Sequence, residues 1–119
     1  GPLIMEFLEA NYQNPALSAQ MICDRFRISR TYLSRLIKNE TGQGLVDCIH
    51  DIRVQHAKQL LAETSLPVEQ LALQVGFSNR YGLIRAFRSL EGISPSEYRR
   101  RSGRKLWHDA LSGCVSIDT

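Results

Sequence analysis

Residues 45–63 read LVDCIHDIRVQHAKQLLAE, and this stretch decides how the rest of the chain is arranged. It contains no Gly or Pro, and its apolar residues return at steps of three and four, which is the period of an α-helix and not of a strand. Gly44 precedes the stretch and Pro67 follows it, so both of its ends are marked. A helix of this length spans roughly 28 Å at about 1.5 Å per residue. We therefore predict a rod-like helix that separates two flanking regions.

The two flanking regions are copies of one pattern. Residues 18–42 and 67–92 align so that Ile22 corresponds to Leu71 and, after a one-residue insertion past the turn, Arg35 corresponds to Arg85. Each copy is predicted to form a helix, a tight turn and a second helix. That arrangement is a helix-turn-helix, whose second helix usually reads DNA. One such pattern is a weak signal because many helical pairs resemble it, whereas two copies in register on a rod are a much stronger one.

The two predicted turns differ at one position, where Arg27 in the first copy corresponds to Gly76 in the second. Glycine enters left-handed backbone at little cost, whereas arginine pays on the order of 1 kcal/mol. The first turn is therefore either mildly strained or shaped differently, and the sequence leaves both alternatives open. Hydroxyl and amide side chains next to the predicted helices suit N-caps: Ser18, Ser29 and either Ser78 or Asn79.

The second helix of each copy carries a polar stripe. Thr31, Ser34, Arg35 and Lys38 recur at the spacing that places them on one helical face, and the stripe holds only hydroxyls and cations. Arginine can donate two hydrogen bonds to guanine, and a threonine methyl can contact a thymine methyl. The second copy is predicted to present Tyr81, Arg85 and Arg88, with Gly82 between them. The expected apolar faces are Tyr32, Leu33, Leu36 and Ile37 in the first copy, and Leu83, Phe87 and Leu90 in the second.

The basic residues are gathered in windows free of acids. The 119 residues carry a formal charge of only +3, yet thirteen of the fifteen Lys and Arg lie in residues 25–39, 70–90 and 98–108. None of the twelve Asp and Glu falls in these windows. Two of the windows contain the second helices of the copies, so this segregation favours a polyanionic partner over a merely solvated surface.

Other function classes find little support in the composition. The three cysteines, Cys23, Cys48 and Cys114, are widely spaced and form no metal-ligand set, so we predict no metal and no cofactor. Reduced thiols fit a cytoplasmic protein. No nucleophile, base and acid are arranged for catalysis, so an enzyme is not expected. No apolar run approaches the roughly 18 residues of a membrane span, so no membrane partner is expected.

Several short motifs together resemble the DNA-binding domain of the AraC/XylS family of bacterial transcription regulators. They are KNETGQ at 38–43, Arg53 followed by AKQLL at 57–61, LA at 71–72, VGFS at 75–78, RAFR at 85–88 and GISPSEYR at 92–99. The resemblance covers about residues 3–101. It implies an all-α domain of seven helices, in which two helix-turn-helix subdomains (18–42 and 67–92) are joined by a long linker helix (45–63), with a C-terminal tail at 102–119.

The resemblance also implies which residues contact DNA, with two reader helices of one monomer in successive major-groove segments. The base-reading positions carried over are Thr31, Ser34, Arg35, Tyr81, Gly82 and Arg85. The expected phosphate contacts are Arg30, Lys38, Arg53, Arg80, Arg88 and Arg99, although Arg53 lies beside the apolar stripe and is equally well interpreted as a buried buttress. Gly82 either allows a close approach to DNA or is simply tolerated, and the second motif is expected to read fewer bases. Arg27 and Cys48 also depart from the family pattern.

These features predict sequence-specific binding of double-stranded DNA and bacterial transcription regulation, with activation expected rather than repression. RNA polymerase is a further expected partner, and the alternative function is a helical protein-interaction module, such as one that docks on polymerase without reading DNA. Family members commonly carry an effector-binding or dimerisation domain, and nothing in this chain corresponds to one. Gly1-Pro2 resembles the remnant of a cleaved tag, so we expect an excised C-terminal half; the alternative is a naturally short regulator.

Overall fold

The computed structural model describes residues 2–102, which form seven helices and no strand. Six of them have both ends defined: α1 (Pro2–Asn11), α2 (Ala19–Phe26), α3 (Arg30–Thr41), α4 (Leu45–Glu63), α5 (Val68–Gln74) and α6 (Arg80–Glu91). A seventh helix, here called the C-terminal helix, occupies residues 95–102. The all-α, seven-helix prediction is confirmed. The predicted tail, apart from Ser102, lies outside the described residues, as does Cys114.

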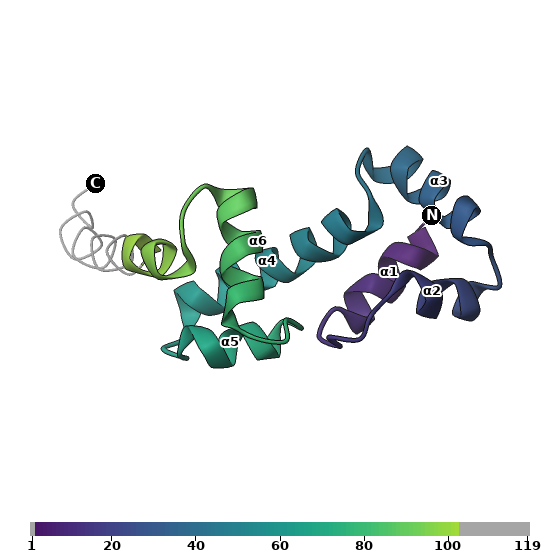
Figure 1. The fold of residues 1–119 in the computed structure, drawn as a ribbon. Coiled ribbons are helices and arrows are strands. Elements are labelled where there is room, and N and C mark those ends of the chain that lie inside the picture. Colours follow the sequence, from purple (N-terminus) through teal and green to yellow (C-terminus); the bar gives the residue numbers. More distant parts are fainter. Residues whose placement is uncertain (1, 103–119) are drawn as a thin grey trace, which may run out of the picture.

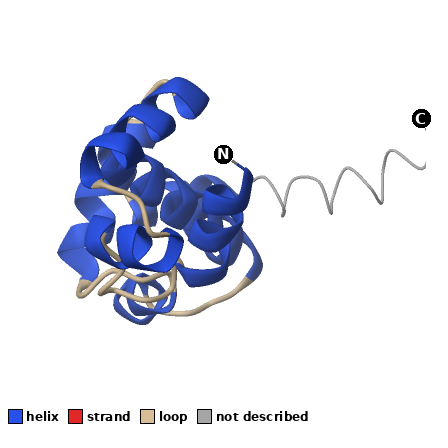
Figure 2. Cartoon of the chain, turned by 90° about the vertical axis from the view of Figure 1, so that its right-hand side faces the viewer, coloured by secondary structure: helices blue, strands red, loops and turns tan. Residues whose placement is uncertain are grey.

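Helix α4 joins two lobes (Figure 1). Helices α1, α2 and α3 surround its first half, and α5, α6 and the C-terminal helix surround its second half. The molecule is elongated, with extents of 58 × 32 × 22 Å. Figure 2, a view turned by 90°, shows that loops connect the successive helices. The predicted rod and its predicted ends are therefore confirmed.

Each lobe has its own hydrophobic core. Ile52 is the last α4 residue in the first core, and Val54 is the first in the second core. The largest fully buried side chains include Leu8 and Ile22 in the first lobe and Phe87 in the second. The two cores are divided at Arg53 of α4. Within residues 2–102, no single apolar core therefore extends through both lobes. Among the partly buried hydrophobic residues of the described range, Tyr12 is the one that packs against both cores.

The predicted N-caps are present. The Ser18 hydroxyl accepts a hydrogen bond from the backbone N–H of Met21 at 3.2 Å, and Ser29 caps α3 in the same way at 3.1 Å. Of the two candidates for α6, Asn79 is the cap, because its side-chain oxygen accepts from two backbone N–H groups of the first turn. Each such cap stabilises a helix by about 1 kcal/mol.

The two turns both contain a left-handed residue, so the first one carries strain, and they also differ in detail. Arg27 has φ 56° and Gly76 has φ 104°, both in the left-handed region. The backbone N–H of Ile28 donates to the carbonyl of Cys23 at 3.1 Å, and Phe77 donates in the corresponding place at 3.0 Å. Both turns share this closing hydrogen bond. They differ in the preceding one, because the N–H of Arg27 donates to the carbonyl of Cys23 whereas the N–H of Gly76 donates to that of Leu73.

Two residues expected on apolar faces are exposed instead. Tyr32 is 52% exposed and Leu90 is 42% exposed, so these two predictions were wrong. In α3 the buried row is Leu33 and Ile37, and Tyr32 is turned about 100° away from Leu33, towards solvent. Leu90 lies one turn beyond Phe87, in the last turn of α6, where the buried row has ended.

Candidate nucleic-acid interface

The outer faces of the reader helices α3 and α6 are exposed and cationic. Thr31, Ser34, Arg35, Tyr81 and Arg85 are all exposed, as are Arg30, Lys38, Arg80 and Arg88. The ion pairs found within residues 2–102 join His56 to Glu9, Lys58 to Glu91, and both Arg100 and Arg101 to Glu97. The cations on the two readers have no carboxylate partner in that part of the chain, so their charge is available to a polyanion.

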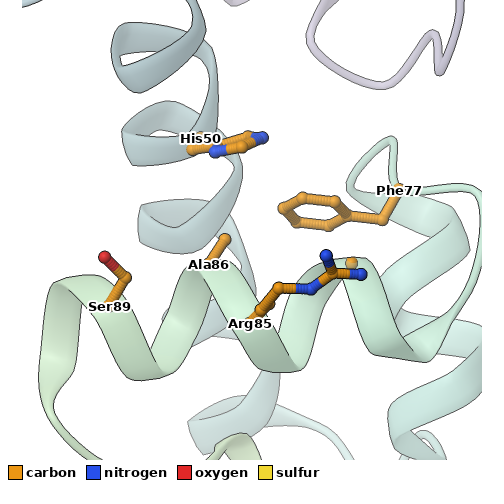
Figure 3. A pocket seen from close by; sticks show the side chains of 6 residues that line it. His50, Phe77, Arg85, Ala86 and Ser89 are labelled. Atoms are coloured by element: carbon orange, nitrogen blue, oxygen red, sulfur yellow. The ribbon is translucent and has the colours of Figure 1, made fainter.

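Each reader borders a hollow against α4, and the two hollows share one side of that helix. The first, of about 320 Å³, lies between Arg30 and Ser34 of α3 and the start of α4 at Val46 and Asp47. The second, of about 470 Å³, lies between α6 and α4 and is lined by His50, Phe77, Gly82, Arg85, Ala86 and Ser89 (Figure 3). Asp47 and His50 are three residues apart and therefore lie on the same helical face. The readers thus flank the same side of the linker.

His50 was assigned no role from the sequence, yet its side chain extends from α4 into the second hollow (Figure 3). Its ring centroid lies 5.8 Å from that of Phe77. Burial lowers the pKa of His50, the charge of Arg53 lowers it further, and Asp47 opposes the shift. The imidazole is therefore biased towards its neutral form. No sequence signal indicates this position, because His50 and Arg85 are brought together only by the packing of α6 on α4.

Arg80 and Tyr81 support one another at the start of α6. The Arg80 guanidinium Nη2 donates to the Tyr81 hydroxyl at 3.0 Å, and its central carbon lies 5.0 Å from the centroid of the Tyr81 ring. This hydrogen bond raises the pKa of Arg80 above its already high ordinary value. A predicted phosphate contact and a predicted base reader are therefore held side by side on the exposed end of the second reader.

Arg53 is a buttress, and the prediction of a phosphate contact at this position is corrected. Its side chain is buried, at 7% exposure. The guanidinium Nε donates to the carbonyl of Tyr12 and Nη2 donates to the carbonyl of Asn14, each at 2.9 Å. Burial lowers the pKa of Arg53, but arginine remains protonated in proteins. Its N–H groups donate to carbonyls inside the molecule. Of the two interpretations that the sequence left open, the buried buttress is therefore the correct one.

Arg99 was also predicted to contact phosphate, and the structure places it in a different role. Its three guanidinium nitrogens donate to the carbonyls of Leu61, Thr64 and Leu66, at 3.2, 3.3 and 2.5 Å. These carbonyls lie where α4 ends and the chain turns towards α5. The side chain thus satisfies carbonyls that the helix end leaves without partners, and it holds the C-terminal helix against the second lobe.

The side-chain direction of Gly82 points at Phe77. A Cβ atom added at this position would lie 3.1 Å from the ring of Phe77. Glycine therefore makes room for an aromatic ring within the second lobe, an explanation that the sequence did not suggest. Of the six positions predicted to read bases, this is the one whose side-chain direction is occupied by the protein itself.

Metal and membrane sites are not found in the described part of the chain. Residues 2–102 contain no group of three or more His, Cys, Asp or Glu side chains that could hold a metal ion. None of the helices within that range is both long enough and apolar enough to cross a membrane. Cys23 and Cys48 are free thiols buried in the first core.

The fold and the exposed surfaces define a class of protein. Two helix-turn-helix units lie on one rod, each with an unpaired basic second helix, and this is the organisation of a double helix-turn-helix DNA-binding domain. Residues 22–101 match a family described as "Helix-turn-helix domain". The chain belongs to the AraC/XylS family of transcription regulators.

Known relatives agree with this assignment. The chain is 31% identical over 96 residues to the multiple antibiotic resistance protein MarA of Escherichia coli K12, a match that covers 81% of this chain and 75% of MarA. It is 31% identical over 100 residues to the transcriptional regulator GlxA of Rhizobium meliloti, covering 84% of this chain but only 31% of GlxA. The chain therefore spans most of one relative and less than a third of the other.

Solved structures share the fold. The C-terminal domain of AraT, a response regulator from Geobacillus stearothermophilus, is 30% identical, with a TM-score of 0.78 and coverage of 81% of this chain and 79% of that one. The DNA-binding domain of AdpA, solved in complex with a target DNA, has a TM-score of 0.82 and covers 87% of this chain and 93% of its own. At 22% identity, the likeness to AdpA shows the fold alone.

Proposed function

We propose that residues 3–101 of this chain bind double-stranded DNA sequence-specifically, with α3 and α6 in successive major-groove segments on one face of the duplex. The observation that carries the proposal is the shared side of α4 on which both readers present cations without carboxylate partners. AdpA, which has the same fold, was solved with its target DNA. Helix-turn-helix proteins place one reader helix in each of two major-groove segments about one helical turn apart.

The contacts divide between bases and phosphates. We propose that Thr31, Ser34, Arg35, Tyr81 and Arg85 read base edges, together with the Gly82 backbone if the helix approaches closely enough. Arg30, Lys38, Arg80 and Arg88 are proposed to contact phosphates. A bidentate arginine contact discriminates against a wrong base by about 1–3 kcal/mol, whereas a phosphate contact adds affinity on every sequence.

The rod length also supports a bend in the bound DNA. Successive major-groove segments on one face lie ~34 Å apart, which exceeds the roughly 28 Å expected for a helix of nineteen residues. Bending a site towards the protein costs on the order of 1–6 kcal/mol, which the second set of contacts offsets. Circularly permuted duplexes should therefore differ in gel mobility, and equal mobility would show straight DNA.

The proposed biological setting is bacterial transcription regulation in the cytoplasm, with activation as the expected outcome and RNA polymerase as a second partner. The likeness to MarA, a multiple antibiotic resistance protein, and to GlxA, a transcriptional regulator, supports regulation in general. Activation and polymerase contact are carried by the family resemblance alone. Reporter transcription from a promoter that contains the selected site would distinguish activation from repression.

The experiment that tests DNA reading begins with selection of bound duplexes from a random pool. Enriched duplexes should share two short sequence elements, and fluorescence anisotropy should show a steep fall of affinity with salt. Arg35→Ala should weaken binding and relax specificity at one position, whereas Arg30→Ala should weaken all sequences and reduce the salt slope by about one.

Arg25→Ala is the matched control, because Arg25 is an exposed arginine of α2 outside both readers. It should leave the base preference unchanged. A shallow salt slope and no enriched sequence would favour a protein-interaction module instead, and an equal loss on all sequences for Arg35→Ala would make that residue a phosphate contact only.

A further inference from the structure

The two lobes touch at a second place besides the continuous α4 helix. This place, here called the junction, consists of Tyr12, Arg53, His56, Gly76 and Phe77. Tyr12 follows α1, Arg53 and His56 lie in α4, and Gly76 and Phe77 form the turn before α6. In Figure 1 the loop after α1 lies beside the α5–α6 turn, which agrees with these contacts.

Arg53 connects the lobes through one side chain. It donates to the carbonyls of Tyr12 and Asn14 in the first lobe, each at 2.9 Å, while its guanidinium carbon lies 5.5 Å from the centroid of the Phe77 ring in the second lobe. A guanidinium is planar and can form hydrogen bonds in its plane while it stacks on an aromatic face. This geometry makes Arg53 specific for both partners at once.

The backbones of the two lobes are also in direct contact. A Cβ atom at Gly76 would lie 2.0 Å from the carbonyl oxygen of Tyr12 and 2.8 Å from Nε of Arg53, so no side chain can be accommodated there. Tyr12 is held from the other side, because its ring stacks on His56 at a centroid distance of 4.0 Å with planes 7° apart. His56 in turn lies 3.0 Å from the carboxylate of Glu9 in α1.

The junction continues into the second reader. The ring of Phe77 lies against Gly82 of α6, at 3.1 Å from where a Cβ atom would stand. A series of contacts therefore runs from the end of α1 through Arg53 and Phe77 to the helix proposed to enter the second major-groove segment. A displacement of Arg53 therefore changes the support beneath that reader through Phe77, which lies at the edge of the second hydrophobic core.

We propose that the junction sets the orientation of α6 relative to the first helix-turn-helix, and so determines how many base pairs must separate the two DNA segments that the chain accepts. Arg53 is the positioning residue. The inference rests on the proposed function. One inserted base pair rotates the second segment by roughly 34° and shifts it by about 3.4 Å, so a rigid junction should reject it and a loosened one should tolerate it.

The first test measures binding to the selected duplex and to versions with one base pair inserted or deleted between its two elements. The wild-type chain should lose roughly tenfold or more in affinity on either change, because one reader falls out of register. Lysine at position 53 keeps the charge but cannot donate to both carbonyls and stack on the ring. In Arg53→Lys, the loss of affinity caused by the inserted or deleted base pair should therefore shrink to about threefold or less.

Arg99→Lys is the matched control, since Arg99 also donates to backbone carbonyls but only within the second lobe. It should keep the wild-type spacing preference even where it lowers the melting temperature. His56→Ala, a milder change at a partly exposed side chain that stacks on Tyr12, should move spacing tolerance in the same direction as Arg53→Lys. An Arg53→Lys chain that binds all spacings more weakly by one common factor would overturn the proposal.

A second measurement does not depend on DNA. Residual dipolar couplings of the free protein should fit one alignment tensor for both lobes in the wild type and in Arg99→Lys, and two different tensors in Arg53→Lys. If selection enriches no duplex, the proposed function fails while the couplings still decide the junction. A single tensor in both Arg53→Lys and His56→Ala would refute the junction whatever the DNA result.

Discussion

The first and second turns each place one residue in the left-handed region and differ in their surroundings. Arg27 is exposed at φ 56°, whereas Gly76 is buried at φ 104° against the Tyr12 carbonyl. The first turn can therefore carry any side chain that accepts the left-handed strain. The second turn cannot carry one at all, because the other lobe occupies the space. The two turns occupy equivalent places in the repeat but differ in role. The first turn connects two helices, whereas the second also contacts the other lobe.

The reader helices show the same asymmetry. In α3 the polar stripe of Thr31, Ser34 and Arg35 is exposed, and each position offers a side chain. In α6, Tyr81 and Arg85 correspond to Thr31 and Arg35, but Ile84 stands where α3 has Ser34. The remaining base-reading position predicted for α6, Gly82, has its side-chain direction filled by Phe77. One predicted base-reading position of the second reader therefore packs against the protein instead of offering a side chain to DNA. We expect the first motif to supply more of the base discrimination and the second to be the more sensitive to how the lobes are positioned.

The largest effect that would break this comparison is expected from Gly76→Ala. Left-handed alanine costs about 1–2 kcal/mol, and overpacking against the Tyr12 carbonyl adds roughly 1–3 kcal/mol. Urea unfolding should therefore show a loss of roughly 2–5 kcal/mol. Gly92→Ala is the control, because Gly92 has φ 78° but nothing within 4 Å of an added Cβ. Equal losses for the two variants would show that the contact between the lobes contributes nothing.

The next largest effect concerns the arginines at equivalent positions of the two readers. Arg35→Ala and Arg85→Ala should each weaken binding to the selected duplex by about 1–3 kcal/mol and relax specificity at one base pair. Because the residues lie in separate lobes, the losses should add within about 0.5 kcal/mol in the double variant. Anisotropy titrations check this, and strong non-additivity would mean that the readers do not bind independently once positioned.

A smaller effect of opposite sign is expected from Arg27→Gly. Removing the side chain relieves left-handed strain on the order of 1 kcal/mol, since the turn keeps its shape and Arg27 is exposed. The melting temperature should rise. Arg25→Gly, two residues earlier inside α2, should instead lower stability by roughly 1 kcal/mol. A chain destabilised by Arg27→Gly would show that the arginine side chain makes a favourable contact that outweighs the strain.

The smallest expected effect is a pH dependence confined to the second lobe. The hollow beside α3 contains Asp47, whereas the one beside α6 contains His50, whose pKa burial and Arg53 lower. The unfolded chain therefore binds more protons than the folded chain just below pH ~6.5. Stability should be fully present above that pH and decline as the pH falls. His50→Gln should flatten this decline in urea titrations, and an unchanged slope would assign it to other groups.

Local structure followed closely from the sequence because its causes are local. Helical periodicity placed α4 at its observed bounds, and Ser18 and Ser29 cap their helices as their chemistry predicted. One of the two caps predicted for α6, Asn79, is the observed one. Side-chain direction near helix ends was less predictable. Tyr32 has an aromatic ring but lies one position away from the buried row, and a pattern of apolar residues does not separate these cases.

The roles of Arg53, Arg99 and Gly82 were decided by tertiary structure alone. Arg53 donates to carbonyls 41 and 39 residues away, and Arg99 donates to carbonyls 33 to 38 residues away. The ring of Phe77 occupies the space that a side chain at Gly82 would need. The sequence by itself determined the helices, their repeat and the faces that carry charge, because these depend on neighbours within one or two turns. Which arginine faces solvent and which faces a carbonyl depends on how two lobes dock, and that contact has no local signature.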